Sequence, residues 1–157
     1  MTVFPVFLAT NMANIAITKA IWSDASSLAR IDELVFGGTF KEQDFLDYLD
    51  NPIYCFSVAK IDEKAVGYIG YMIIAGEADI INIGILPDFR GLGIGNMLMD
   101  SMINELKNRA TCIHLEVRES NNIAISLYKK YGFIATGVSK NHYKEPIENA
   151  IRMKLCL

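Results

Sequence analysis

The chain has 157 residues and a formal net charge of −3 at pH 7, and 52% of its residues are hydrophobic while 21% are charged. This composition excludes a disordered or fibrous chain and fits one folded domain. The mild acidity is unlike the basic stripe that nucleic acid requires, and no apolar run reaches the roughly 20 residues of a membrane-spanning helix. We therefore expect a cytoplasmic globular domain with neither nucleic acid nor membrane as a partner.

The N-terminus is expected to be an extension of unknown role, residues 1–11, followed by one domain over residues 12–157. Residues 3–9 are apolar, but Pro5 interrupts them and no basic segment precedes them, which is unlike a secretory signal peptide. Met12 offers an alternative start for the domain.

Cysteine usage indicates reduced thiols and no metal. Cys55, Cys112 and Cys156 are too few and too scattered for a disulfide framework, and no CxxC pair or Cys/His cluster has metal-site spacing. Cys112 and His114 lie two residues apart, but a nucleophilic cysteine needs a base and a third group to orient that base. The sequence identifies no third group, so we expect His114 to be structural.

In the first half of the chain, β-branched and aromatic runs predict strands, and two stretches of helical periodicity predict helices. Ser23 and Asp24 offer a cap for the first helix, and Gly37 ends it. A polar turn at residues 62–64 predicts a hairpin. The expected strands are residues 15–22, 54–61, 65–74 and 78–86, and the second helix covers residues 41–49.

In the second half, a glycine-rich loop at residues 90–95 leads into an amphipathic helix. A strand at 112–117, a helix at 122–131 and strands at 134–138 and 147–157 follow. Hairpins followed by a strand–loop–helix–strand–helix order predict a mixed α/β fold with helices on both faces of the sheet.

The loop places Gly91, Gly93 and Gly95 at alternate positions between a strand and a helix. Such a loop turns backbone N–H groups inward, and the helix adds its unsatisfied N-terminal donors, which together suit a phosphate or pyrophosphate. Gly95 is followed by Asn96 and Met97, so the loop lacks the Gly-Lys-Ser/Thr of a P-loop. A glycine-rich turn without a ligand is the alternative.

Three segments carry a family resemblance. The loop Arg90-Gly91-Leu92-Gly93-Ile94-Gly95 matches the R/Q-x-x-G-x-G/A signature of GNAT acyltransferases. Residues 115–128, with Gly132 and Phe133, resemble the distal block of that family, in particular of the RimI-type ribosomal-protein alanine N-acetyltransferases. The ending from 141 to 153 resembles the same group's Tyr-x-x-Pro and Ala-Ile-x-Met tail.

The resemblance implies a six- to seven-stranded, mixed and splayed sheet with about four helices, and acetyl-CoA as cosubstrate. It assigns the pyrophosphate to backbone amides of the loop, the pantetheine to strand residues and Asn121, the general base to Glu116 and the general acid to Tyr128. The implied coenzyme-binding residues are Ile83, Gly84, Ile85, Arg90, Gly91, Leu92, Gly93, Ile94, Gly95, Asn121 and Tyr128.

The chemistry of acetyl transfer agrees with these roles. A tyrosine hydroxyl stays protonated at neutral pH and can donate to a leaving thiolate. Tyr128 lies seven residues after Asn121, close to two helical turns, so both can face one groove. Glu116 lies on an otherwise apolar strand, where a carboxylate is costly unless it is paired or catalytic. A packed tyrosine and a salt-bridged or solvated carboxylate are the structural alternatives.

The acceptor is expected to be a protein N-terminus, of the kind found on a ribosomal protein that begins with alanine. An α-amine with a pKa near 7.8 is about 15% neutral at pH 7, whereas a lysine is about 0.04% neutral, so a weak base suits the α-amine. Lysine or small-amine acetylation, a non-catalytic acyl-CoA sensor and a nucleotide-binding module remain alternatives. The enzyme is expected to be a monomer or a homodimer.

Overall fold

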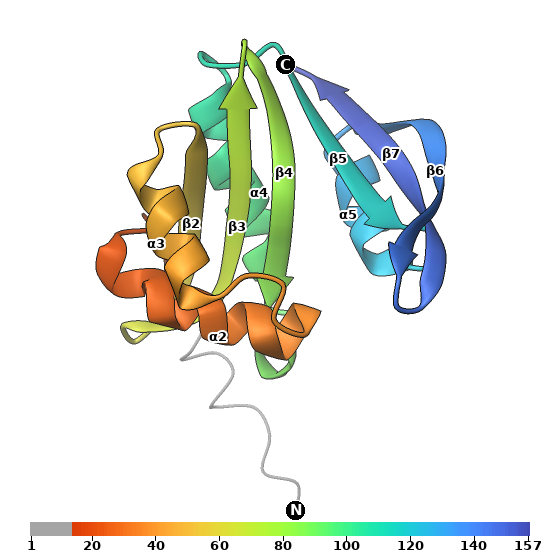
Figure 1. The fold of residues 1–157 in the computed structure, drawn as a ribbon. Coiled ribbons are helices and arrows are strands. Elements are labelled where there is room, and N and C mark those ends of the chain that lie inside the picture. Colours follow the sequence, from red (N-terminus) through yellow and green to blue (C-terminus); the bar gives the residue numbers. More distant parts are fainter. Residues whose placement is uncertain (1–13) are drawn as a thin grey trace, which may run out of the picture. The chain divides into compact units, whose positions relative to one another are not determined.

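The computed structural model describes residues 14–157, so the expected extension, residues 1–11, lies outside the described part (Figure 1). No helix within residues 14–157 is both long enough and apolar enough to cross a membrane. The elements are β1 (Ile15–Lys19), η1 (Trp22–Asp24), α2 (Ala25–Phe36), α3 (Glu42–Asp50), β2 (Tyr54–Ile61), β3 (Lys64–Ile74), β4 (Glu77–Ile85), η2 (Pro87–Phe89), α4 (Ile94–Leu106), β5 (Cys112–Arg118), α5 (Asn122–Lys130), β6 (Ile134–Lys144) and β7 (Ile147–Cys156).

The strands form one mixed seven-stranded sheet in the order β1-β2-β3-β4-β5-β7-β6. β1 and β2 pair antiparallel, as do β5 with β7 and β6 with β7, whereas β4 and β5 pair parallel. Together with four α-helices in residues 14–157, this confirms the predicted mixed α/β class and strand number.

Two tight turns set the register of β2, β3 and β4. Asp62 and Glu63 join β2 to β3 with φ of 49° and 66°, and Ala75 and Gly76 join β3 to β4 with φ of 51° and 78°. Two consecutive residues with positive φ make a type I′ turn, whose twist matches that of the flanking strands. The second turn fixes Glu77 as the first residue of β4.

The first compact unit comprises residues 14–70 and 82–102. Within it, α2 and α3 lie on one side of β2 and β3, and α4 lies on the other (Figure 1). The core on the α3 side is aromatic: the ring of Phe45 meets those of Phe56 and Tyr68 edge-on at 5.6 and 5.7 Å. The burial of these large side chains stabilises the packing of α3 on the sheet.

Asp32 is a fully buried carboxylate in α2. Its Oδ2 accepts a hydrogen bond from the Tyr68 hydroxyl at 3.1 Å, and its Oδ1 accepts one from the Phe40 amide at 3.0 Å. Asn82 adds longer contacts, at 3.5 Å to Asp32 and 3.3 Å to the Tyr68 oxygen. One oxygen of Asp32 is bonded to Tyr68 of β3 and the other to Phe40 in the loop after α2, so Asp32 fixes that loop against the sheet.

The second compact unit comprises residues 71–81 and 103–157. Its central strand, β5, buries Ile113, Leu115 and Val117, which strand alternation places on one face. The helix α5 contributes buried Tyr128, whose ring lies 5.7 Å from that of Phe133.

Two predicted strands differ from the structure. β1 ends at Lys19 because the Asp24 side chain accepts a hydrogen bond from the Ile21 amide at 2.9 Å, which turns the chain into η1. β6 continues to Lys144, well past the predicted end at residue 138, because register shifts let it keep pairing with β7. The residues of this bulged part are largely polar, so the sequence pattern did not predict a strand there.

Candidate functional site

The predicted anion loop lies in the first unit, between η2 and α4. Gly91 and Gly93 have φ of 78° and 80°, a backbone conformation that residues with a Cβ rarely adopt. A Cβ added at either position would have no atom of the described residues within 4 Å, apart from the glycine's own chain neighbours. Both glycines are therefore required by the backbone, and the space beside them is open.

The loop ends in the first turn of α4. The carbonyl oxygen of Gly93 accepts the Met97 amide at 3.1 Å, so the amides of Ile94 and Gly95 precede the first intrahelical donor. These groups carry the positive end of the helix dipole. The Arg90 Nε donates to the Ile85 carbonyl at 3.0 Å and ties the start of the loop to the end of β4. Open space, free amides and a positive dipole end suit an anion.

Gly84 has a packing role that the sequence did not reveal. A Cβ on this residue would lie 2.9 Å from the Phe36 ring, so the glycine lets α2 approach β4. Ile83 and Ile85, its neighbours, are half-buried. All three lie beyond Glu77–Asp79, the part of β4 that pairs with Cys112–His114 of β5.

Tyr128 lies in the second unit and is 5% exposed. Burial, followed by the neighbouring Tyr143, raises the pKa of its phenol above the ordinary value, so the group is a neutral proton donor. Its hydroxyl makes no hydrogen bond to any described residue, and no side-chain oxygen within residues 14–157 is both buried and unpartnered. The hydroxyl therefore reaches solvent.

Asn121 and Glu116, also in the second unit, both have partners. Asn121 caps α5, since its Oδ1 accepts the Ala124 amide at 3.1 Å, and this bond does not use its side-chain N–H donors. Glu116 Oε2 lies 2.9 Å from Nε2 of His142, and both side chains are exposed to solvent. The structural alternative for Glu116, a paired carboxylate, is thus present in the fold.

A further polar cluster, centred on Arg118 near the β6–β7 turn, was not predicted from the sequence. Its guanidinium lies 4.1 Å from the centre of the Tyr143 ring and 3.6 Å from Glu148, and it donates to the carbonyls of Glu145 and Pro146. The Ser120 amide and hydroxyl also bond Glu148, and these bonds, with Arg118, lower the pKa of that carboxyl. The tail motif that carried the resemblance therefore includes a turn that side-chain hydrogen bonds and an ion pair hold in place.

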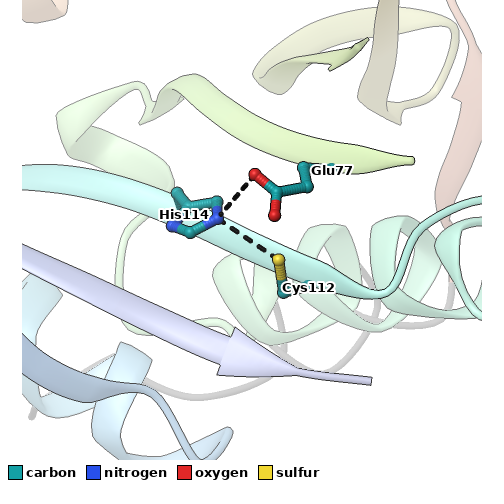
Figure 2. A group of neighbouring side chains, drawn as sticks. All are labelled: Glu77, Cys112 and His114. Carbon is teal, nitrogen blue, oxygen red and sulfur yellow. Dashed lines mark hydrogen bonds and ion pairs between the residues drawn. The ribbon is translucent and has the colours of Figure 1, made fainter. Parts of the chain in front are cut away.

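The second unit also contains a cluster of Glu77, Cys112 and His114 (Figure 2). His114 Nε2 lies 3.2 Å from the Cys112 sulfur and 3.4 Å from Oε2 of Glu77. The third group that the sequence did not identify is therefore Glu77, brought in by the β3–β4 turn and the parallel register. Burial raises the pKa of the Cys112 thiol. Both partners meet the same imidazole nitrogen, whereas a nucleophilic triad uses both ring nitrogens.

Comparisons with known proteins agree with this architecture. Residues 21–133 match the acetyltransferase (GNAT) family. A Bacillus subtilis protein provisionally named a [ribosomal protein bS18]-alanine N-acetyltransferase is 37% identical over 72% of this chain and 76% of its own. An N-alpha-acetyltransferase of Sulfurisphaera tokodaii is 30% identical over 82% of this chain and 86% of its own.

Among solved structures, the ribosomal-protein-S18-alanine N-acetyltransferase from Escherichia coli superposes with a TM-score of 0.83 at 27% identity, covering 90% of this chain and 93% of that one. The protein is accordingly an acyltransferase that uses acetyl-CoA. The chain belongs to the acetyltransferase (GNAT) family, since the match spans more than half of it. The resemblance to RimI-type enzymes that the sequence motifs carried is confirmed.

Proposed function

We propose that this enzyme transfers an acetyl group from acetyl-CoA to the α-amine at a protein N-terminus, with a ribosomal protein that begins with alanine as its acceptor. The observation that carries the proposal is that relatives from both Bacillus subtilis and Sulfurisphaera tokodaii are named for acetylation at an N-terminal amine. Such an acceptor implies action in the cytoplasm, and we assign the catalytic domain to residues 12–157.

We assign coenzyme binding to the residues that the motifs indicated. Amides of the loop from Arg90 to Gly95, with Leu92 and Ile94 between the glycines, would bind the pyrophosphate. Support comes from the open space beside Gly91 and Gly93. Backbone groups of Ile83, Gly84 and Ile85 would pair with the pantetheine, supported by their place beyond the three residue pairs of β4 with β5. Asn121 would add its side-chain donors.

We assign the general acid to Tyr128. In the reaction the acceptor nitrogen attacks the thioester carbonyl carbon, a C–N bond forms and the C–S bond breaks. The departing sulfur needs a proton, which a neutral phenol supplies. Burial keeps Tyr128 protonated, and its solvent-reaching hydroxyl can recover the proton from water.

We assign the general base to Glu116, acting through water. The attacking amine must lose one proton, and an exposed carboxylate is a weak base that suits an α-amine better than a lysine. His142, at 2.9 Å, orients the Glu116 carboxylate. Because both side chains of this pair are exposed, a water molecule can reach the Glu116 carboxylate.

Mass spectrometry of peptides incubated with the enzyme and acetyl-CoA tests the acceptor. One peptide begins with alanine and carries an internal lysine, and its matched control has the same sequence with a blocked N-terminus. We expect acetylation of the free N-terminus of the first peptide and none of the control. Acetylation of the internal lysine in both peptides, with the free N-terminus unmodified, would overturn the proposed acceptor.

A further inference from the structure

We propose that Glu77, Cys112 and His114 form a binding site for a divalent transition-metal cation such as Zn²⁺. A thiol, an imidazole and a carboxylate are the three side-chain types that bind zinc in proteins. Their ligand atoms all lie within 4.8 Å of one another in the second unit. Figure 2 shows the three side chains pointing toward one another from the paired ends of β4 and β5.

The distances fit ligands arranged around one ion. With Zn–S near 2.3 Å and Zn–N and Zn–O near 2.0 Å, tetrahedral geometry puts sulfur and nitrogen about 3.5 Å apart and nitrogen and oxygen about 3.3 Å apart. The observed separations from His114 Nε2 are 3.2 Å to sulfur and 3.4 Å to oxygen. Small side-chain rotations therefore suffice to admit the ion. Nε2 of His114 faces both the Cys112 sulfur and the Glu77 carboxylate. This favours an ion shared by the three groups over a proton relay, which would use both ring nitrogens.

The sheet preorganises this arrangement. Glu77 pairs with Cys112, and Asp79 pairs with His114, in the parallel ladder. Directly paired residues present their side chains on the same face, so the three ligands are held together by backbone hydrogen bonds. Cys112 is 4% exposed, whereas the Glu77 side chain is 57% exposed. The site thus has a dry inner side and an open outer side, where water completes the coordination.

Side chains of opposite charge flank the cluster. Asp79 adds a carboxylate on the same face, and Lys154, which pairs with His114 from β7, adds an ammonium group. Cys156 of β7 pairs with Cys112 in the antiparallel ladder.

When the metal binds, the Cys112 thiol releases its proton to solvent as the metal–sulfur bond forms, and His114 binds through its neutral Nε2.

The test is metal binding by the full chain carrying Cys156→Ser, which prevents a second thiol from binding the ion or forming a disulfide with Cys112. Zn²⁺ is titrated against a chromophoric chelator, and Co²⁺ is added as a spectroscopic probe. We expect one equivalent of either ion and a near-ultraviolet thiolate-to-cobalt charge-transfer band. Absence of saturable binding in this folded protein would overturn the proposal.

Variants identify the ligands in the same background. His114→Gln and Glu77→Gln are each expected to weaken Zn²⁺ binding about 100-fold or more, since even outer-shell changes cost 10–100-fold. Cys112→Ser is expected to abolish the charge-transfer band. His142→Gln is the matched control for loss of a histidine, and it should bind as the parent does. Equal weakening in this control, or a persistent band in Cys112→Ser, would refute the assignment.

These readouts are independent of acetyl transfer. Circular dichroism of each variant verifies that it is folded before binding is compared, so lost affinity is not confused with lost structure. Failure of metal binding would leave the proposed acetylation of N-termini untouched.

Discussion

At the scale of single residues, Tyr128 joins two properties that seldom occur together, because it is almost fully buried and yet its hydroxyl has no hydrogen-bond partner within residues 14–157. A phenol packed only for stability would normally have its oxygen bonded. Its neutral state and solvent contact are what a proton donor to a leaving thiolate requires.

Replacing Tyr128 by Phe is expected to lower kcat by roughly 100-fold while coenzyme affinity stays near that of the parent, because only the proton donor is removed. Thiol release measures turnover, and calorimetry measures coenzyme binding. Tyr131→Phe, one turn further along, is the matched control and should keep its activity. Unchanged turnover in Tyr128→Phe would remove this residue from the acid role.

Asp32 is expected to contribute strongly to the stability of the fold. Asp32→Ala leaves the buried Tyr68 hydroxyl and the Phe40 amide without their acceptor, so the free energy of unfolding is expected to fall by about 2–4 kcal/mol. Asp47→Ala, at an exposed position of α3, should change it by less than about 0.5 kcal/mol. Urea unfolding followed by circular dichroism measures both, and equal effects would contradict the role given to Asp32.

At the scale of elements, the loop before α4 has two separate features: a backbone conformation that needs glycine, and open space that a ligand could fill. Gly93 needs its positive φ, but a side chain there would enter open space. A substitution therefore costs the protein only backbone strain, about 1–2 kcal/mol, whereas a coenzyme in that space would meet the new side chain.

We expect Gly93→Val to abolish measurable coenzyme binding while the protein stays folded. Gly76→Val is a matched control, because Gly76 has φ of 78° and likewise no protein atom within 4 Å of an added Cβ, but it lies in the β3–β4 turn. The control should show a similar loss of stability and normal coenzyme affinity by calorimetry. Intact affinity in Gly93→Val would contradict the assignment of the loop.

Elements were largely predictable from the sequence, because hydrophobic periodicity, Gly37 and the alternating loop glycines act locally. The bulged half of β6 was not, since its polar residues join the ladder only through pairing with β7. Glu77 likewise joins Cys112 and His114 through turn geometry and strand register. The two roles of Glu116, base or ion-pair partner, depend on His142, which lies 26 positions away along the chain.

At the scale of the whole molecule, burial of phenols links stability to pH. Burial raises the pKa of both Tyr68 and Tyr128. The unfolded chain would ionise them near pH 10 while the folded protein keeps their protons, so the free energy of unfolding falls as the pH rises above about 10. Below that pH both groups are protonated in either state, and their contribution does not change with pH.

Thermal unfolding between about pH 8 and pH 11 checks this linkage. We expect Tm to fall at the alkaline end, and to fall less steeply in Tyr128→Phe when each protein is compared with its own value at pH 8. This variant leaves the hydrogen bonds of Asp32 intact, so the comparison isolates one phenol. Identical slopes would show that Tyr128 ionises equally in both states.

The division into two compact units has a consequence for how the protein can be dissected. The chain passes from one unit to the other after Gly70, Ile81 and Met102, which lie inside β3, β4 and α4. Every boundary thus falls within a continuous strand or helix. Neither unit can be excised as a separate module without cutting the regular backbone hydrogen bonding of these elements.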